Sequence, residues 1–255
     1  MSVRSFYDRL AESYHLIFEN WDQSMARQAG ALDGILQQRW GLGGCTLLDA
    51  AVGIGTQSLG LAARDYGVIG ADISALAVAR ARREAARRRL ALPLVVADFR
   101  NLPFTAAAVD AVIACDNAVP HLLSLSEIRL ALEEFRRCLR PGGACLVSMR
   151  DYTAPPPAGT VEHRPYGERD WNGRRYIAEQ EWRWQGATYQ LVMRIQPAGS
   201  SEGDVDRIEV ETTYFAVPVN AVLELMRDVG FIDVDRIDGV YYQPLLVGTS
   251  PVARR

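Results

Sequence analysis

The sequence predicts an α/β fold: a seven-stranded, mainly parallel sheet with helices on both faces, an N-terminal helical cover, and an antiparallel β insertion after the fifth strand. Short apolar strands alternate with helix-sized segments between residues 45 and 149, which is typical of a parallel sheet with right-handed crossovers. The first of these strands ends in an Asp and a glycine turn. After residue 150, long runs alternate apolar and polar residues and indicate antiparallel strands. With 255 residues, 49% of them hydrophobic, the chain can form one large domain with an insertion.

The predicted elements follow one another in a simple order. Helical segments over Ser5–Gln38 precede the first strand, which starts at Cys45. The core continues with helix Thr56–Tyr66, strand Gly67–Asp72, helix Ser74–Leu90, strands Leu94–Ala97 and Val109–Cys115, helix Ser126–Arg140, the turn Pro141–Gly143 and strand Ala144–Met149. Asp151–Gly173 is predicted to be a loop, followed by strands Arg174–Gln185, Thr188–Gln196 and Val205–Val217; helix Val219–Val229 and strands Phe231–Ile237 and Val240–Val247 close the sheet. We therefore expect one domain made of a cover (1–40), a ligand-binding core (41–150), an insertion (151–217), and a closing helix with a β-hairpin (218–255).

Composition excludes several kinds of protein. The net charge is −3 and all 28 basic residues are Arg, a bias typical of a GC-rich bacterial genome. The basic run Arg80–Arg89 lies on an Ala-rich helical segment whose arginines can face water, so no nucleic-acid partner is expected. The four cysteines form no C-x-x-C pair and fit the reduced core of a cytoplasmic protein. No signal-peptide pattern and no apolar run of 18 residues occurs, so no membrane association is expected, and the oligomeric state stays open.

The glycine turn after the first strand predicts a ligand site. Glycine lets backbone N–H groups approach a ligand, and the following helix presents its N-terminus to it. Gly53 and Gly55 form the turn, but Ser58 stands where the dinucleotide fingerprint requires a third glycine, and no Gly-Lys-Ser/Thr follows. These departures favour a nucleoside ligand without a pyrophosphate. The alternative is a turn that only packs a helix on the sheet.

Acidic residues at the ends of neighbouring strands support the same site. Asp72 ends the second strand, 23 residues after Asp49, at the spacing where doubly wound folds place a carboxylate on a ribose. Asp98 and Phe99 follow the third strand and suit an adenine ring and its amine. The alternatives are a loop-entry cap for Asp98 and core packing for Phe99. Because ligands of open α/β sheets bind beyond the carboxyl ends of the strands, these residues are expected to converge.

The residues after the fourth and fifth strands indicate the kind of acceptor. Asp116-Asn-Ala-Val-Pro-His121 lacks the Asx-Pro-Pro-aromatic motif of enzymes that methylate nucleic-acid bases. Arg150 directly follows the fifth strand. Removing a guanidinium from water into a cleft costs free energy unless it pairs with an anion, and a small carboxylate is a suitable partner. The alternatives are a structural ion pair of Arg150 with Asp151 or Asp116, and a capping role for Asn117.

These motifs resemble those of the class I S-adenosylmethionine (AdoMet) methyltransferases, which have a Rossmann-like core. Asp49-x-Ala-x-Gly-x-Gly-Thr together with Asp72 resembles motif I and the ribose acid of that class. Asn117-x-x-x-His121-Leu, Met149-Arg-Asp-Tyr152, the N-terminal Tyr14–Asp22 and Tyr214-Phe215 resemble the glycine and sarcosine N-methyltransferases. Val52 replaces the cysteine usual in motif I.

The resemblance implies roles for particular residues. The expected AdoMet-binding residues, including those of the turn, are Tyr14, Arg27, Asp49, Ala51, Gly53, Gly55, Asp72, Ile73, Asp98, Phe99, Cys115 and His121. Asn117 and Arg150 are expected to hold an amino-acid substrate and serve catalysis, and Tyr152 and Tyr214 to complete its pocket. No role follows for Tyr166, Tyr176 and Tyr242.

The expected reaction is methyl transfer to the amine of glycine, sarcosine or a similar small amino acid by in-line displacement. AdoMet carries the activated methyl group, so the protein must mainly align an amine and exclude water. The three histidines lie far apart and no Cys/His cluster occurs, so no metal is expected. The alternatives are an N- or O-methyltransferase of another small metabolite, for example in specialised biosynthesis, and a non-catalytic AdoMet-binding module.

Overall fold

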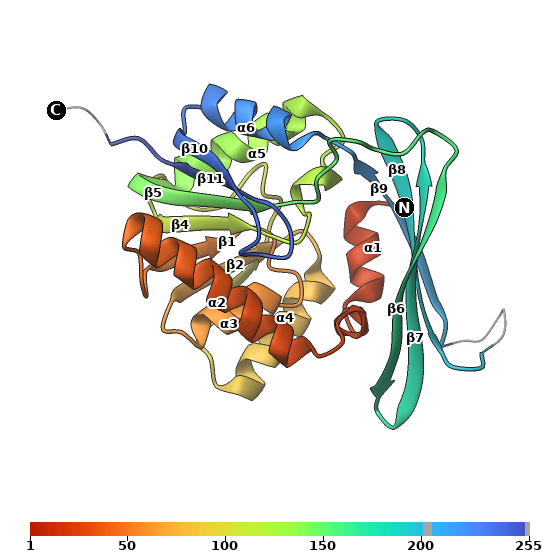
Figure 1. Cartoon of the computed structure of the whole chain (residues 1–255). Helices are drawn as coiled ribbons and strands as arrows, with labels where there is room; N and C mark the ends of the chain where they lie inside the picture. The colour runs from red at the N-terminus through yellow and green to blue at the C-terminus, as the bar shows by residue number, and fades with distance from the viewer. Residues whose placement is uncertain (201–205, 253–255) are drawn as a thin grey trace.

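A seven-stranded sheet forms the centre of the computed structural model, which describes residues 1–200 and 206–252 (Figure 1). Its strands are β1 (Thr46–Asp49), β2 (Gly67–Asp72), β3 (Leu94–Val96), β4 (Val109–Ala114), β5 (Leu139–Ser148), β10 (Ile232–Ile237) and β11 (Leu245–Thr249). They lie in the order β10-β11-β5-β4-β1-β2-β3. β11 runs antiparallel to both of its neighbours and the other pairs are parallel. The predicted sheet is thereby confirmed.

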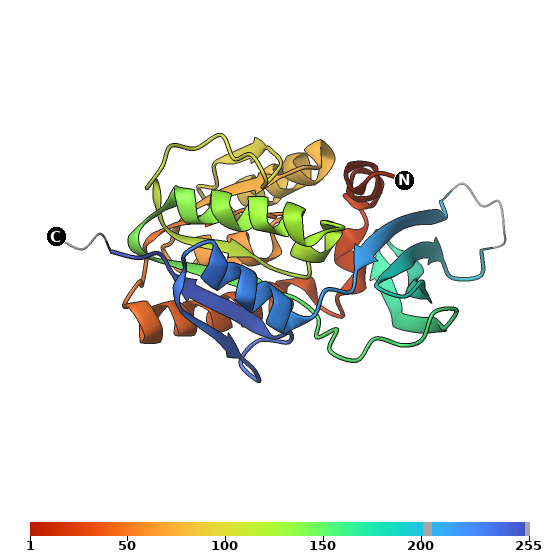
Figure 2. The same cartoon turned by 90° about the horizontal axis from the view of Figure 1, so that it is seen from above.

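Helices cover both faces of this sheet, because each buried strand presents apolar side chains to both sides. Leu47 packs in one apolar cluster with Leu36 and Leu59, whereas the next residue, Leu48, packs in another with Leu132. The first cluster lies under α2 (Trp21–Trp40), α3 (Thr56–Ala62) and α4 (Ala75–Arg88), and the second under α5 (Leu125–Cys138) and α6 (Val219–Asp228) (Figures 1 and 2).

A second sheet stands beside the first and consists of four antiparallel strands. They are β6 (Val161–Trp171), β7 (Arg174–Trp184), β8 (Thr188–Pro197) and β9 (Ile208–Phe215), paired in chain order. Helix α1 (Val3–Leu10) lies between this sheet and the larger one (Figure 1). Side chains of the inner face, among them Trp182 and Tyr189, belong to the same apolar cluster as Phe6 of α1 and Val147 of β5. The predicted antiparallel insertion therefore shares a core with the rest of the chain.

Strand β6 corrects the predicted loop over residues 151–173. Residues Val161–Trp171 pair along β7, with an irregularity between Pro165 and Gly167. β6 is an edge strand whose side chains are exposed or only half-buried. Because it buries neither face, it has no apolar periodicity from which a strand could be predicted. Only the segment before it lacks regular structure.

Smaller differences concern the ends of elements. The predicted strand over 240–247 begins only at Leu245, and helix α3 stops at Ala62 rather than Tyr66. The turn at Pro141–Gly143 is part of β5, where the register with β4 shifts. The predicted start of a strand at Val205 lies outside the described residues.

Two further predictions concern local features. Ser74 caps α4 as predicted, its hydroxyl accepting from the Ala77 amide at 3.0 Å. No helix within the described part of the chain combines the length and apolarity needed to cross a bilayer.

Candidate functional site

A cavity of about 280 Å³ lies where β1, β2 and β4 end, beneath the N-terminal cover. Nine of the residues predicted to bind AdoMet line it: Tyr14, Ala51, Gly53, Asp72, Ile73, Asp98, Phe99, Cys115 and His121. They come from five separate segments of the chain, which the sheet brings to one edge. The convergence expected from strand ends is therefore present.

Asp72 holds the glycine turn in place. One of its carboxylate oxygens accepts from the amide of Gly53 at 2.8 Å and the other from the amide of Ser74 at 2.9 Å. Gly53 (φ +51°) lines the cavity, whereas Gly55 (φ +98°) lies behind it, where a Cβ atom would meet Leu59 at 3.0 Å. Burial raises the pKa of Asp72 against the lowering effect of the two amides.

Asp49 supports the turn from below and does not line the cavity. It is fully buried and accepts from the Ser58 hydroxyl at 2.7 Å and from the Ala51 amide at 3.3 Å. Burial raises the pKa of Asp49 to about 7, in spite of these hydrogen bonds. Asp49 therefore contacts the backbone and side chains that form the turn rather than the cavity.

Asp98 reaches the cavity already paired with a neighbour that sequence reasoning missed. Arg100, two residues further on, forms an ion pair with it at 2.6 Å and a second with Glu127 at 2.6 Å, and both partners also line the cavity. Hydrogen bonding by the Arg100 guanidinium lowers the pKa of Asp98, which stays ionised. Phe99 packs edge-on against Phe135, with ring centroids 5.8 Å apart, so core packing and cavity lining both apply to it.

The N-terminal cover closes the cavity from outside the sheet. Tyr7 and Ala11, from α1 and the segment after it, line the cavity together with Tyr14, the first residue of the 3₁₀ helix η1 (Tyr14–Ile17). The Tyr7 hydroxyl lies 2.8 Å from His121 Nε2 and 3.3 Å from the Tyr214 hydroxyl. Burial and the charge of Arg150 lower the pKa of His121 to about 3, so this imidazole is neutral near pH 7.

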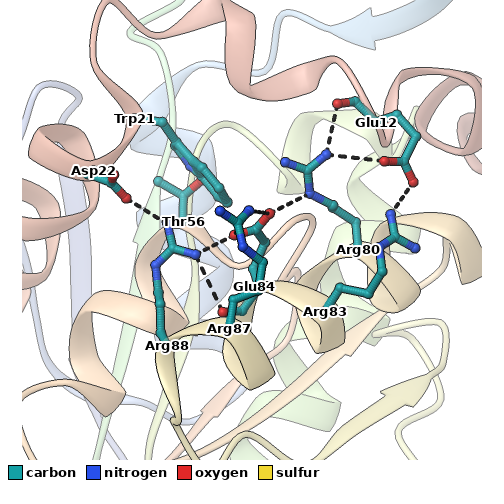
Figure 3. Close-up of polar contacts among 9 residues, drawn as sticks. All are labelled: Glu12, Trp21, Asp22, Thr56, Arg80, Arg83, Glu84, Arg87 and Arg88. Atoms are coloured by element: carbon teal, nitrogen blue, oxygen red, sulfur yellow. Dashed lines mark hydrogen bonds and ion pairs between the residues drawn. The ribbon is translucent and has the colours of Figure 1, made fainter. Parts of the chain in front are cut away.

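An arginine–glutamate network fastens this cover to α4 (Figure 3). Glu84, buried on α4, pairs with Arg80, Arg87 and Arg88 of the same helix. Arg80 also bonds to Glu12 in the segment between α1 and η1, and Arg88 to Asp22 at the start of α2. The basic run therefore includes structural arginines as well as solvated ones.

Arg27 is a third predicted cofactor residue, besides Asp49 and Gly55, that does not line the cavity. It is exposed on α2, its nearest polar partner is Ser24 at 3.5 Å, and it does not line the cavity. The side of α2 that faces the site presents Gln28, hydrogen-bonded to Gln57 at 2.7 Å.

The predicted substrate residues form a second cluster next to the cavity. Asn117 is buried and accepts from the Arg150 amide at 2.9 Å, and its amide nitrogen donates to the Tyr152 hydroxyl at 2.8 Å. The Arg150 guanidinium lies 4.6 Å from the centre of the Trp182 ring and donates to the Tyr189 hydroxyl at 3.3 Å. The His121 and Tyr214 rings, 4.0 Å apart, join this cluster to the cavity.

The guanidinium of Arg150 is enclosed by aromatic side chains rather than by acids. Asp151, one of its possible structural partners, instead pairs with Arg236 at 2.8 Å. Among the described residues no carboxylate forms an ion pair with Arg150. Burial opposes its charge, yet Tyr189, Tyr152 and Tyr214 together raise the pKa of Arg150, which therefore stays cationic.

Asp116 lines the cavity, whereas the sequence suggests for it only a structural ion pair with Arg150. It and Asn117 have φ values of +59° and +66°, a conformation that non-glycine residues adopt at a cost. The hydroxyls of Tyr241 (3.1 Å) and Tyr242, from the loop between β10 and β11, donate to its carboxylate. No role had followed for Tyr242, since its contact joins residues 126 positions apart.

Comparisons with known proteins agree with this geometry. Residues 47–143 match the family model described as a methyltransferase domain. The chain is 33% identical over 134 residues to a glycine/sarcosine N-methyltransferase of Halorhodospira halochloris (52% of this chain, 49% of that protein). It is 36% identical over 114 residues to a demethylmenaquinone methyltransferase of Clavibacter sepedonicus (43% and 42%). The aligned regions thus span about half the length of these relatives.

The similarity in fold extends over nearly the whole chain. The SAM-bound structure of CalS10, an amino pentose methyltransferase from Micromonospora echinaspora, superposes with a TM-score of 0.72 at 19% identity, covering 94% of this chain and 95% of that one. The cavity residues fit AdoMet, because a glycine turn, a strand-end acid and an aromatic ring converge on one apolar hollow. The family model assigns a methyltransferase domain to residues 47–143, and the fold and the cavity agree with a class I AdoMet-dependent methyltransferase.

Proposed function

We propose that the chain transfers a methyl group from AdoMet to the amine of glycine, sarcosine or a similar small amino acid. The observation that carries this proposal is Arg150, a half-buried cation that lacks an ion-paired carboxylate within the described residues and stands next to the cofactor cavity. A guanidinium in such a place is stabilised by a bidentate carboxylate. An amino acid supplies that group two bonds away from its amine.

The residues have distinct tasks in this reaction. When bound, AdoMet supplies an electrophilic methyl group on a sulfonium centre. Arg150 binds the acceptor carboxylate, and Asn117 fixes the backbone of Arg150 through its side-chain oxygen. The aromatic rings of Trp182, Tyr189 and Tyr214 exclude water from the guanidinium. Positioning of this kind accounts for a large part of the rate of a two-substrate reaction.

The test is an acceptor panel with labelled AdoMet, containing small amino acids, their amides, their decarboxylated analogues, and RNA. We expect the label in a small amino acid and not in its amide. Arg150→Ala should lose about 2–5 kcal/mol of transition-state stabilisation while retaining AdoMet affinity, and Arg150→Lys should restore little, since a point charge lacks the planar fork.

Arg164→Ala is the matched control. Its guanidinium also lies over Trp182, at 3.8 Å, but it is half-exposed and paired with Glu162 at 2.6 Å. We expect its kcat/KM to stay within about threefold, because exposed ion pairs contribute little. If wild-type protein methylates the amide as fast as the acid, the carboxylate site is refuted.

A second candidate is N- or O-methylation of another small metabolite such as an amino sugar. CalS10, whose fold this chain shares, is an amino pentose methyltransferase, and the rings of Tyr189 and Tyr214, stacked 5.3 Å apart, add an apolar side to the Arg150 cluster. Adding amino sugars to the same panel separates the two candidates. A panel with no labelled acceptor at all would favour a non-catalytic AdoMet-binding module.

A further inference from the structure

We propose that Asp116 binds the amino group of the acceptor and takes one proton from it before methyl transfer. This inference rests on the proposed function, because it requires an amine acceptor.

Asp116 stands between the cofactor cavity and the Arg150 cluster. It lines the cavity beside Cys115, and the charge of Arg150 acts on it although no ion pair forms between the two. A carboxylate and a guanidinium on neighbouring parts of the site match the two charges of an amino-acid zwitterion, with the acceptor carboxylate on Arg150 and its ammonium on Asp116.

The partners of Asp116 leave room for a cation. Two other acids among the described residues have strong donors: the buried Glu84 pairs with three arginines, and the half-buried Asp72 accepts from two amides. The hydroxyls of Tyr241 and Tyr242 both donate to the same carboxylate oxygen of Asp116, Oδ1. Gln57 is a further hydrogen-bonding partner of this carboxylate, and no cation forms an ion pair with it among the described residues. A carboxylate accepts about four hydrogen bonds in all, so an ammonium group can still bind there.

The backbone at Asp116 and Asn117 adopts a conformation of higher energy that places the Asp116 carboxylate. Asp116 and Asn117 both adopt left-handed φ values, and the Asp116 amide donates to the Ser148 hydroxyl at 2.8 Å. Strain of this kind persists only where surrounding contacts enforce it, and it concentrates at functional sites. Here the enforced turn brings Asp116 to the cavity and Asn117 to the Arg150 amide.

The proton step is balanced without any further reactant. The ammonium N–H bond breaks, its proton passes to the Asp116 carboxylate, and the nitrogen keeps the electron pair that then attacks the methyl group. Burial raises the pKa of Asp116, although hydrogen bonds from Tyr242, Gln57 and Tyr241 and the charge of Arg150 oppose it. A higher pKa makes the carboxylate a better proton acceptor.

The test compares wild-type protein with Asp116→Asn, which keeps the shape and removes the charge. We expect kcat/KM for the amine to fall by about 10²–10⁴ at pH 7, the usual contribution of a general base, with AdoMet affinity unchanged by calorimetry. The deficit should shrink as the pH approaches the pKa of the acceptor amine, because neutral amine then binds directly. Weaker binding of the acceptor to the complex with the demethylated cofactor is a second, independent readout.

Other titrating groups must be separated from Asp116. Those that act on it or are acted on by it are Arg150, Asp49, Cys115, Tyr14, Tyr166, Tyr241 and Tyr242. All are shared by wild type and Asp116→Asn, so the difference between the two pH profiles isolates the carboxylate. Tyr242→Phe removes one donor to Asp116 and should move the acidic limb of the profile to higher pH.

Several results would overturn the inference. Equal kcat/KM and equal pH profiles in wild type and Asp116→Asn refute it while leaving the proposed function intact. A tenfold loss of AdoMet affinity with unchanged turnover assigns the carboxylate to the cofactor instead. A wild-type protein that methylates no amine refutes both proposals together.

Discussion

Replacing Asp72 with Asn tests how the strand-end acid serves both the glycine turn and the cofactor. The Asp72 carboxylate accepts from the amides of Gly53 and Ser74 at 2.8 and 2.9 Å. Asn keeps one acceptor oxygen and turns an N–H group toward the other amide, so one donor loses its partner. An unsatisfied donor of this kind costs about 1–3 kcal/mol.

The same substitution removes a hydrogen-bond acceptor from the cavity. A ribose hydroxyl left without its acceptor costs a further ~1–3 kcal/mol of binding, which is about 5- to 150-fold in the AdoMet dissociation constant. Calorimetric titration measures this loss, and denaturant unfolding measures the loss of stability separately. Thermal unfolding should shift down by about 2–4 °C for each kcal/mol.

Asp8→Asn is the matched control for the loss of charge. Asp8 accepts from the Ser74 hydroxyl at 2.6 Å and from the Leu76 amide at 3.1 Å, but it does not line the cavity. Its AdoMet affinity should stay within about threefold of wild type. If Asp72→Asn binds AdoMet as tightly as wild type, Asp72 has no contact with the cofactor and the assignment is wrong.

The remaining predictions concern packing, ionisation and the cover. Gly60→Ala should destabilise the fold by about 1–3 kcal/mol, because the new Cβ would lie 2.6 Å from the Met25 carbonyl oxygen of α2. Gly34→Ala should instead stabilise the fold by about 0.5–1 kcal/mol, because its Cβ would meet nothing within 4 Å. Urea unfolding measures both changes. Since burial raises the pKa of Asp49 to about 7, the contribution of Asp49 to stability should fall as the pH rises from about 4 through 7. Asp49→Asn should therefore gain relative stability over that range, and a constant difference would contradict the assignment. Glu84→Gln should lower stability, because it leaves Arg80 and Arg88 without their shared carboxylate, whereas a variant as stable as wild type would show that the network is energetically neutral.

Local patterns allowed part of the structure to be predicted from sequence. The strand–Asp–glycine turn and Asp72 could be identified because their geometry depends on neighbouring residues and on a fixed strand-to-strand spacing. The same holds for the cap at Ser74. Strand β6 could not be found, because it lies at a sheet edge and buries neither face.

Contacts between distant segments account for what sequence reasoning missed. The pairing of Arg100 with Asp98 leaves no periodic signal, although the two residues are close in sequence. Asp116 is hydrogen-bonded to Tyr241 and Tyr242, and Tyr7 to His121. These contacts depend on how the loop between β10 and β11 and helix α1 pack at the sheet edge, far in sequence from the residues that they contact. The role of Arg27 stays a prediction from the resemblance, since its side chain is exposed on α2 and does not line the cavity.

The position of Tyr7 makes the two halves of the site thermodynamically linked. Its hydroxyl contacts His121, which lines the cofactor cavity, and Tyr214 on the second sheet. One side chain of α1 therefore connects the cavity with the cluster around Arg150. Linkage then requires reciprocity: whatever factor AdoMet adds to acceptor affinity, the acceptor adds to AdoMet affinity. Tyr7→Phe should reduce that factor in both directions by the same amount.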